Sequence, residues 1–107
     1  MSTEVPKYTY LAVIPDLPDS KRMDVRPQHL ANAAEFFKQG LLIEGGATFS
    51  DDQAKQDGSA KMNGSWMLFH AENMEKAREW LQNDIYTKGG AWDMSKVQIF
   101  SIARAKH

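Results

Sequence analysis

The hydrophobic period of this chain switches between that of a strand and that of a helix in a fixed order, and this order constrains the fold more than any other feature. Apolar residues alternate at a period of two over residues 8–14, and they recur at the 3.6-residue period of a helix over residues 30–41. The later segments with strand character are 41–49, 65–70 and 96–104, and the second helical stripe covers 74–81. The predicted order is therefore strand, helix, strand, strand, helix, strand.

This order is the split βαβ pattern of a ferredoxin-like domain, an α+β fold in which a βαββαβ chain forms one antiparallel sheet with both helices on one face. Both faces of the predicted strands carry apolar residues, as Tyr10 and Leu11 illustrate in the first strand. Since two helices cover only one face, we expect the other face to pack against a second copy of the chain.

Proline, glycine and asparagine predict where the helices begin and end. Pro27 suits a first helical turn, so the first helix is expected to begin near Arg26. Gly40 is expected to end it in the left-handed conformation, and Asn73 is expected to cap the second helix. Two irregular stretches are predicted, a mobile polar loop at about 50–64 and a second stretch at 84–93.

Composition limits the classes of function. The 107 residues suit one domain, 1–107, with a core of about 7–104, and the net charge of -1 offers no basic field for nucleic acid or an anionic membrane. The absence of cysteine excludes disulfides and thiol catalysis. No apolar run reaches the roughly 20 residues of a membrane span, and the N-terminus does not resemble a signal peptide, so we expect a cytoplasmic protein.

His29 and Asp84 are the candidate catalytic residues. Histidine is the side chain whose ordinary pKa lies near neutral pH, and a carboxylate that holds one ring nitrogen turns the other into an oriented acid or base. The alternatives are local hydrogen bonding by a histidine near a helix start and amide bonding by an aspartate in a loop. His29, His70 and His107 show no metal-ligand spacing, so we expect no metal. We also expect no cofactor, because proton transfer needs only a placed base and a polar group that stabilises the resulting charge.

Arg26 and Tyr86 are candidate substrate-binding residues. The planar guanidinium of Arg26 suits a substrate carboxylate, although a surface ion pair with Asp24 or Glu35 explains it nearly as well. Tyr86 could line a pocket or donate a hydrogen bond, and burial that anchors its loop is the stronger alternative.

Gly45 and Ser65 are candidate pocket residues as well. Gly45 and Gly46 lie inside a predicted strand, where a glycine pair indicates either a bulge or the close approach of another group, including a ligand. Ser65 opens the third predicted strand, where serine is usually structural.

Several of these features together resemble the YCII-related, or YciI-like, family. The resemblance covers residues from about 8 to about 100 and rests on Arg26-Pro27-x-His29-Leu30, Gly40-x-Leu42, Gly45, Gly64-Ser65, Ala77-x-x-Trp80, Asp84-x-Tyr86 and Gly90. The chain departs from the family pattern at Ile85 and Gly46, where the family often has proline.

The resemblance implies a dimeric α+β barrel, similar in fold to muconolactone isomerases, with a His–Asp pair that falls here on His29 and Asp84. It favours a cofactor-free lyase or isomerase that acts on a small cyclic, carboxylate-bearing metabolite. Whether the chain is an enzyme stays open, because the same fold would serve a non-catalytic small-molecule-binding or accessory dimerisation domain. The expected partners are a second copy, in a homodimer or higher oligomer, and a small ligand.

Overall fold

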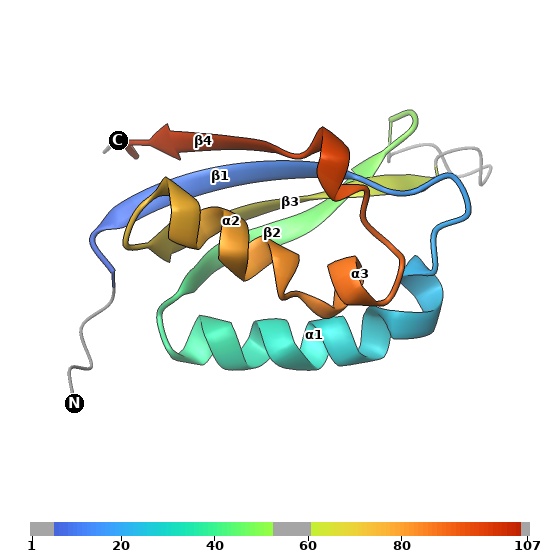
Figure 1. Cartoon of the computed structure of the whole chain (residues 1–107), viewed down its shortest axis with the longest axis horizontal. Coiled ribbons are helices and arrows are strands. Elements are labelled where there is room, and N and C mark those ends of the chain that lie inside the picture. The colour runs from blue at the N-terminus through green and yellow to red at the C-terminus, as the bar shows by residue number, and fades with distance from the viewer. Residues whose placement is uncertain (1–5, 53–60, 106–107) are drawn as a thin grey trace.

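The computed structural model describes residues 6–52 and 61–105 and contains the predicted order of strands and helices. The strands are β1 (Tyr8–Pro15), β2 (Leu42–Phe49), β3 (Met62–Ala71) and β4 (Gln98–Ile102). The helices are α1 (Arg22–Lys38), α2 (Met74–Gln82), the short α3 (Ile85–Lys88) and the 3-10 turn η1 (Met94–Lys96). Figure 1 shows α1 and α2 on the same face of the sheet.

The four strands form one sheet in the order β2-β3-β1-β4, and each neighbouring pair is antiparallel. This order confirms the ferredoxin-like α+β fold. The hairpin β2–β3 lies at one edge, and β1 lies between β3 and β4, so the two central strands β3 and β1 carry most of the inner face.

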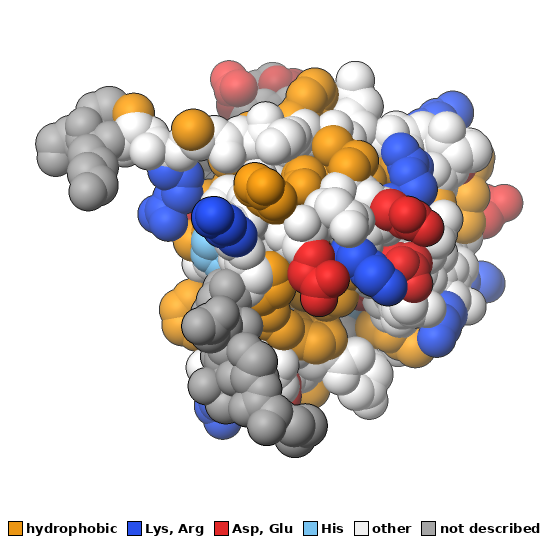
Figure 2. Space-filling model, turned by 60° about the vertical axis from the view of Figure 1, so that its left-hand side comes forward, with side chains coloured by type: hydrophobic (Ala, Val, Ile, Leu, Met, Phe, Trp, Pro, Cys, Tyr) orange, Lys and Arg blue, Asp and Glu red, His pale blue; other side chains and the backbone are white. Residues whose placement is uncertain are grey.

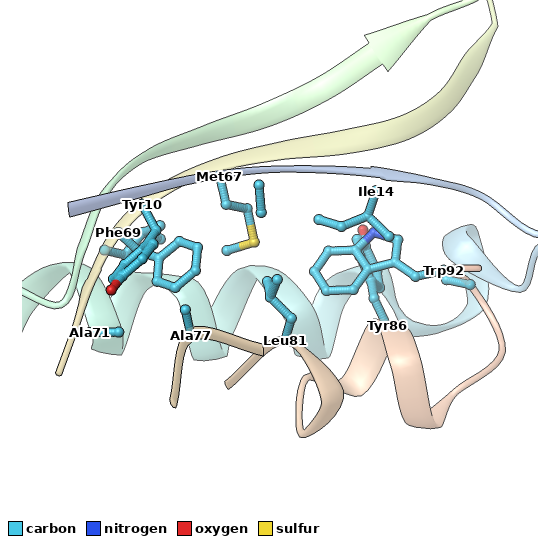
Figure 3. Packing of buried hydrophobic residues seen from close by; sticks show 12 residues of the cluster. Tyr10, Ile14, Met67, Phe69, Ala71, Ala77, Leu81, Tyr86 and Trp92 are labelled. Atoms are coloured by element: carbon cyan, nitrogen blue, oxygen red, sulfur yellow. The ribbon is translucent and has the colours of Figure 1, made fainter. Parts of the chain in front are cut away.

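The core lies between the sheet and the helices. Side chains alternate along β1, so that every second residue faces the helices and is buried. The buried residues labelled in Figure 3 are Tyr10, Ile14, Met67, Phe69, Ala71, Ala77, Leu81, Tyr86 and Trp92. Burial of each large aliphatic side chain in this cluster stabilises the fold by about 1.5–3 kcal/mol. Tyr86 and Trp92 close the core beside Ile14, at the end where α3 lies.

The outer face of the sheet is apolar but not buried in the single chain. Leu11, Val13, Trp66 and Leu68 are partly buried there, and Phe100 keeps 47% of its surface exposed. Figure 2 shows another side of the molecule, the one at the left of Figure 1, on which hydrophobic side chains lie among charged ones. The second copy that we expect against the outer face remains a prediction.

Helix α1 begins at Arg22, so the predicted start near Arg26 was wrong. The additional turn is held by contacts with a distant segment, which the local sequence does not reveal. The N–H of Lys21 donates to the carbonyl of Gly90 at 3.0 Å, and the hydroxyl of Ser20 donates to the carbonyl of Ala91 at 2.9 Å. Pro27 consequently lies inside the helix, where it lacks one backbone N–H donor, and His29 lies beyond the first turn.

The predicted end of α1 and the predicted start of α2 agree with the structure. Gly40 follows α1 with a φ of 76°, and Asn73 caps α2 by accepting the N–H of Lys76 at 2.8 Å. The stretch 84–93, in contrast, is not wholly irregular. It contains α3, and Gly90 follows this helix with a φ of 80°.

Two strands differ from their predicted bounds by more than one residue. β3 begins at Met62 rather than Ser65, because Gly64 pairs with Pro15 and Met62 pairs with Phe49. β4 is shorter at both ends than the predicted 96–104, and at its start η1 includes Lys96. Residues 53–60 of the predicted mobile loop lie outside the described residues.

The glycine pair in β2 accommodates a close approach rather than a bulge. Gly45 and Gly46 pair in unbroken register with Met67 and Trp66, and the two register shifts in this hairpin lie at Leu42/Glu44 and Thr48/Phe49. A Cβ atom on Gly46 would lie 2.8 Å from Nε1 of Trp66, so the indole ring occupies the space that a side chain would need.

Candidate functional site

The structure brings His29 of α1 and Asp84 of the loop before α3 into contact. Nδ1 of His29 lies 2.9 Å from Oδ1 of Asp84, and the two side chains are only 12% and 8% exposed. An ionised carboxylate can only accept, so the neutral imidazole carries its hydrogen on Nδ1 and its lone pair on Nε2. Nε2 has no hydrogen-bond partner among residues 6–52 and 61–105.

Asp84 occupies its position because it is the N-cap of α3. Its Oδ1 accepts the backbone N–H of Tyr86 at 2.9 Å, which satisfies one of the unpaired donors at the start of the helix. The same oxygen therefore caps α3 and holds His29. This dual contact fixes the carboxylate and restricts the rotation of the imidazole.

Aromatic rings hold the imidazole on further sides. The ring of Tyr86 stacks on His29 with centroids 3.7 Å apart and an interplanar angle of 3°. The rings of Trp92 and His29 are nearly perpendicular, with centroids 5.8 Å apart. Tyr86 is 1% exposed and does not line the pocket described below, so it lies behind the histidine. Burial raises the pKa of the Tyr86 phenol, which therefore stays neutral over the physiological range.

A pocket of about 140 Å³ lies between α1 and the β2–β3 hairpin. This volume is close to the roughly 150 Å³ of an engineered cavity that admits benzene, so a single six-membered ring is the natural size of occupant. Its lining residues are Arg26, His29, Leu30, Ala33, Leu42, Gly45, Gly46, Ala47, Met62, Ser65, Trp66 and Met67. Four residues predicted from the sequence, His29, Arg26, Ser65 and Gly45, thus meet at one cavity.

Arg26 lies at this pocket without an ion-pair partner among the described parts of the chain. Neither Asp24 nor Glu35, the acidic neighbours considered from the sequence, pairs with it in the described structure. A guanidinium with free donors at the edge of a cavity suits an anionic group of a ligand.

Sequence reasoning missed a buried polar cluster centred on Arg22. Its side chain is almost fully buried, and its NH1 donates to Oδ1 of Asp16 at 3.1 Å. NH1 and NH2 also donate to Oγ of Ser65 at 3.0 and 2.9 Å, and Nε1 of Trp92 donates to the same oxygen at 3.0 Å. No sequence signal indicates this role, because arginine is normally exposed.

Burial dominates the electrostatics of this cluster. It raises the pKa of the Asp16 carboxyl, and this effect exceeds the opposing attraction and hydrogen bond from Arg22. The guanidinium carbon of Arg22 also lies 5.0 Å from the centroid of the Tyr86 ring, in reach of a cation–π interaction. The cluster is therefore in contact with both the pocket serine and the ring that supports His29.

No group of three or more metal-ligating side chains occurs in residues 6–52 and 61–105. Within the same ranges, none of the helices has the length and apolar character needed to cross a membrane.

A family model of the YCII-related domain matches residues 8–101. The chain belongs to the YCII-related family. This confirms the resemblance seen in the sequence, and the match runs from the first residue of β1 to the last residue but one of β4.

Two fungal relatives of this chain differ in how much of their own length it matches. Fusaric acid biosynthesis protein 2 of Gibberella fujikuroi is 36% identical over 102 residues, which cover 94% of this chain and 95% of that protein. Aspartate kinase FUB3 of Fusarium oxysporum is 37% identical over 111 residues, which cover 100% of this chain but 20% of that protein. The chain thus spans about a fifth of the length of the kinase.

One solved structure is similar over nearly the whole YCII-related chain. It is the 5-chloro-2-hydroxyhydroquinone dehydrochlorinase TftG of Burkholderia phenoliruptrix, in complex with 2,5-dihydroxybenzoquinone. The TM-score is 0.68 at 26% sequence identity, and the match covers 92% of this chain and 94% of that chain. The fold is therefore one that, in this neighbour, accommodates a small oxygenated ring.

Proposed function

We propose that this protein is an enzyme that carries out acid–base chemistry on a small cyclic substrate, by isomerisation or elimination, with His29 as the acid–base residue and Asp84 as its orienting partner. The observation that carries the proposal is the 2.9 Å contact between Nδ1 of His29 and Oδ1 of Asp84 at the wall of a cavity of about 140 Å³. Proton transfer of this kind requires no cofactor.

The hydrogen bonds indicate the chemical role of each residue in this proposal. Asp84 keeps the hydrogen on Nδ1, so Nε2 presents a lone pair that can take a proton from a substrate carbon or hydroxyl. As the ring becomes imidazolium, the carboxylate stabilises its charge. Arg26 provides the positive charge for a substrate carboxylate or phenolate.

The solved neighbour supports elimination as the reaction to test first, because its name describes the loss of HCl from a hydroxylated ring. Such a step removes one proton and one chloride ion and needs a base close to the ring. The fusaric acid relative supports a role in small-molecule metabolism.

The test is chloride release from 5-chloro-2-hydroxyhydroquinone, together with binding of 2,5-dihydroxybenzoquinone measured by tryptophan fluorescence. We expect release in the unaltered protein and a loss of about 10²–10⁴-fold in His29→Ala. Circular dichroism must show that His29→Ala is folded. Release that persists in the folded variant would exclude His29 as the acid–base residue.

A second candidate is a non-catalytic domain that binds a small molecule or dimerises as an accessory part of larger proteins. The match to one fifth of aspartate kinase FUB3 favours it, because the domain there accounts for a minor part of an enzyme with another activity. Binding of the quinone without chloride release, and without exchange of its ring hydrogens for deuterium in D₂O, is the result that this candidate predicts.

A further inference from the structure

We propose that the hydroxyl of Ser65 donates a hydrogen bond into the pocket, to a ligand oxygen that carries or develops negative charge, and that the buried Arg22 holds and strengthens this donor. The proposal rests on the proposed function for the kind of ligand that enters the pocket. The direction of the Ser65 hydroxyl follows from its hydrogen bonds together with its place at the wall of the pocket.

Three donors converge on one oxygen. Oγ of Ser65 accepts from NH1 and NH2 of Arg22 at 3.0 and 2.9 Å and from Nε1 of Trp92 at 3.0 Å. A serine hydroxyl has two lone pairs and a single hydrogen, whereas guanidinium and indole nitrogens can only donate. Both lone pairs of this oxygen are therefore used by donors that lie on the core side of Ser65.

The hydrogen of Ser65 must point elsewhere. No acceptor for it occurs among the described residues, since each of the three hydrogen bonds of Oγ is one that it accepts. Ser65 lies on the inner face of β3 and lines the pocket, although only 2% of its surface is exposed. The O–H is consequently available to whatever occupies the cavity.

Arg22 acts through Ser65 and does not contact the ligand itself. It is not among the lining residues, and its Nε is buried without a partner in the described structure. A cation that donates to a hydroxyl oxygen draws electron density from the O–H and makes it a stronger donor, above all in a site of low dielectric constant. Arg22 is thus a positioning residue, kept in place by Asp16.

The resulting subsite specifies a class of ligand. Ser65 offers a polarised O–H, Arg26 a positive charge and His29 a base, all at a cavity that suits one six-membered ring. A ring that bears a carbonyl, enolate or phenolate oxygen satisfies these groups together. When His29 takes a proton from such a ring, negative charge that develops on the oxygen would be stabilised by Ser65.

A high-resolution crystal structure of the protein soaked with 2,5-dihydroxybenzoquinone tests the direction of the donor. We expect an oxygen of the quinone, or an ordered water if the quinone does not bind, about 2.7 Å from Oγ of Ser65 on the pocket side. An Oγ with no neighbour on that side, or a hydroxyl that donates to a backbone carbonyl, would overturn the proposal.

Substitutions test the strength of the donor in solution. Ser65→Ala should weaken quinone binding by about 10–100-fold, as expected for a hydrogen bond to a charged oxygen, and Ser65→Thr should restore it to within a few-fold. Ser101→Ala, in β4 and away from the pocket, is the matched control. Unaltered binding in Ser65→Ala would contradict the proposal.

The role of the cation is tested by the double variant Asp16→Asn/Arg22→Met, which removes both buried charges together. We expect this double variant to bind the quinone more weakly although Ser65 is still present. Adding Ser65→Ala to the double variant should then weaken binding by a smaller factor than Ser65→Ala does in the unaltered protein. An equal effect of Ser65→Ala in both backgrounds would remove Arg22 from the proposal.

These outcomes separate this inference from the proposed function. Chloride release that depends on His29 but is unaffected by Ser65→Ala would overturn the Ser65 role and leave the acid–base function standing. Weaker quinone binding in Ser65→Ala, without chloride release by the unaltered protein, would support the subsite and count against catalysis.

Discussion

Oδ1 of Asp84 lies 2.9 Å from Nδ1 of His29 and equally 2.9 Å from the backbone nitrogen of Tyr86, whose ring stacks on that same histidine. One carboxylate oxygen thus orients the imidazole and starts the helix whose aromatic residue supports the ring. Because the two roles share an atom, the orientation of His29 is linked to the integrity of α3.

The two roles of Asp84 can be separated by substitution. Asp84→Asn keeps a good N-cap but loses the negative charge, so we expect chloride release to fall by about 10²–10⁴-fold with the free energy of unfolding nearly unchanged. Asp84→Ala should also lose about 1 kcal/mol of stability, because the cap is gone. Urea unfolding measures the difference, and an Asp84→Asn protein with full turnover would exclude the orienting role.

Asp16 should make stability depend on pH. Because burial raises its pKa in the folded state above the value of 3.8, its neutral form favours folding, and this contribution is lost as the pH rises through the raised pKa. The free energy of unfolding of the unaltered protein, minus that of Asp16→Asn, should therefore decrease from about pH 4 towards neutral pH. Urea unfolding of both proteins across this range measures the difference. A difference that increases with pH would contradict the prediction.

Phe100 should report on the predicted dimer. It faces outward opposite Leu11 with 47% of its surface exposed, whereas Ile99 pairs with Ala12 and packs against the core. Phe100→Glu should therefore dissociate a dimer formed through the outer face, while a charge at Ile99 would instead unfold the chain.

Sedimentation velocity measures this effect, with Phe37→Glu as the control. Phe37 is 62% exposed but lies on α1, on the other side of the sheet. We expect monomers for Phe100→Glu and dimers for Phe37→Glu. An unchanged dimer in Phe100→Glu would count against packing through the outer face.

Two glycines should respond differently to a methyl group. At Gly45 the added carbon would lie 3.3 Å from the carbonyl oxygen of Trp66 and beside the pocket, so Gly45→Ala should weaken quinone binding with little loss of stability. At Gly64 it would lie 2.7 Å from the carbonyl oxygen of Ile14, so Gly64→Ala should destabilise the fold by about 1–3 kcal/mol. Fluorescence titration and urea unfolding distinguish them. Equal binding in Gly45→Ala and the unaltered protein would show that Gly45 does not limit the pocket.

Local chemistry made much of the architecture predictable. The alternation in β1, the left-handed Gly40 and the Asn73 cap each depend on residues close together in the chain, and the structure agrees with all three. The start of α1 was mispredicted because it depends on contacts of Lys21 and Ser20 with Gly90 and Ala91, a distant part of the chain.

By itself, then, the sequence determined the order of strands and helices and the chemical types present, since propensity, period and capping act over a few residues. Only the tertiary structure decided that an imidazole and a carboxylate separated by 55 residues would touch, and that Arg22 would be buried against Ser65. Both outcomes require packing of the helices on the sheet, because burial and low dielectric constant arise only when distant segments exclude water together.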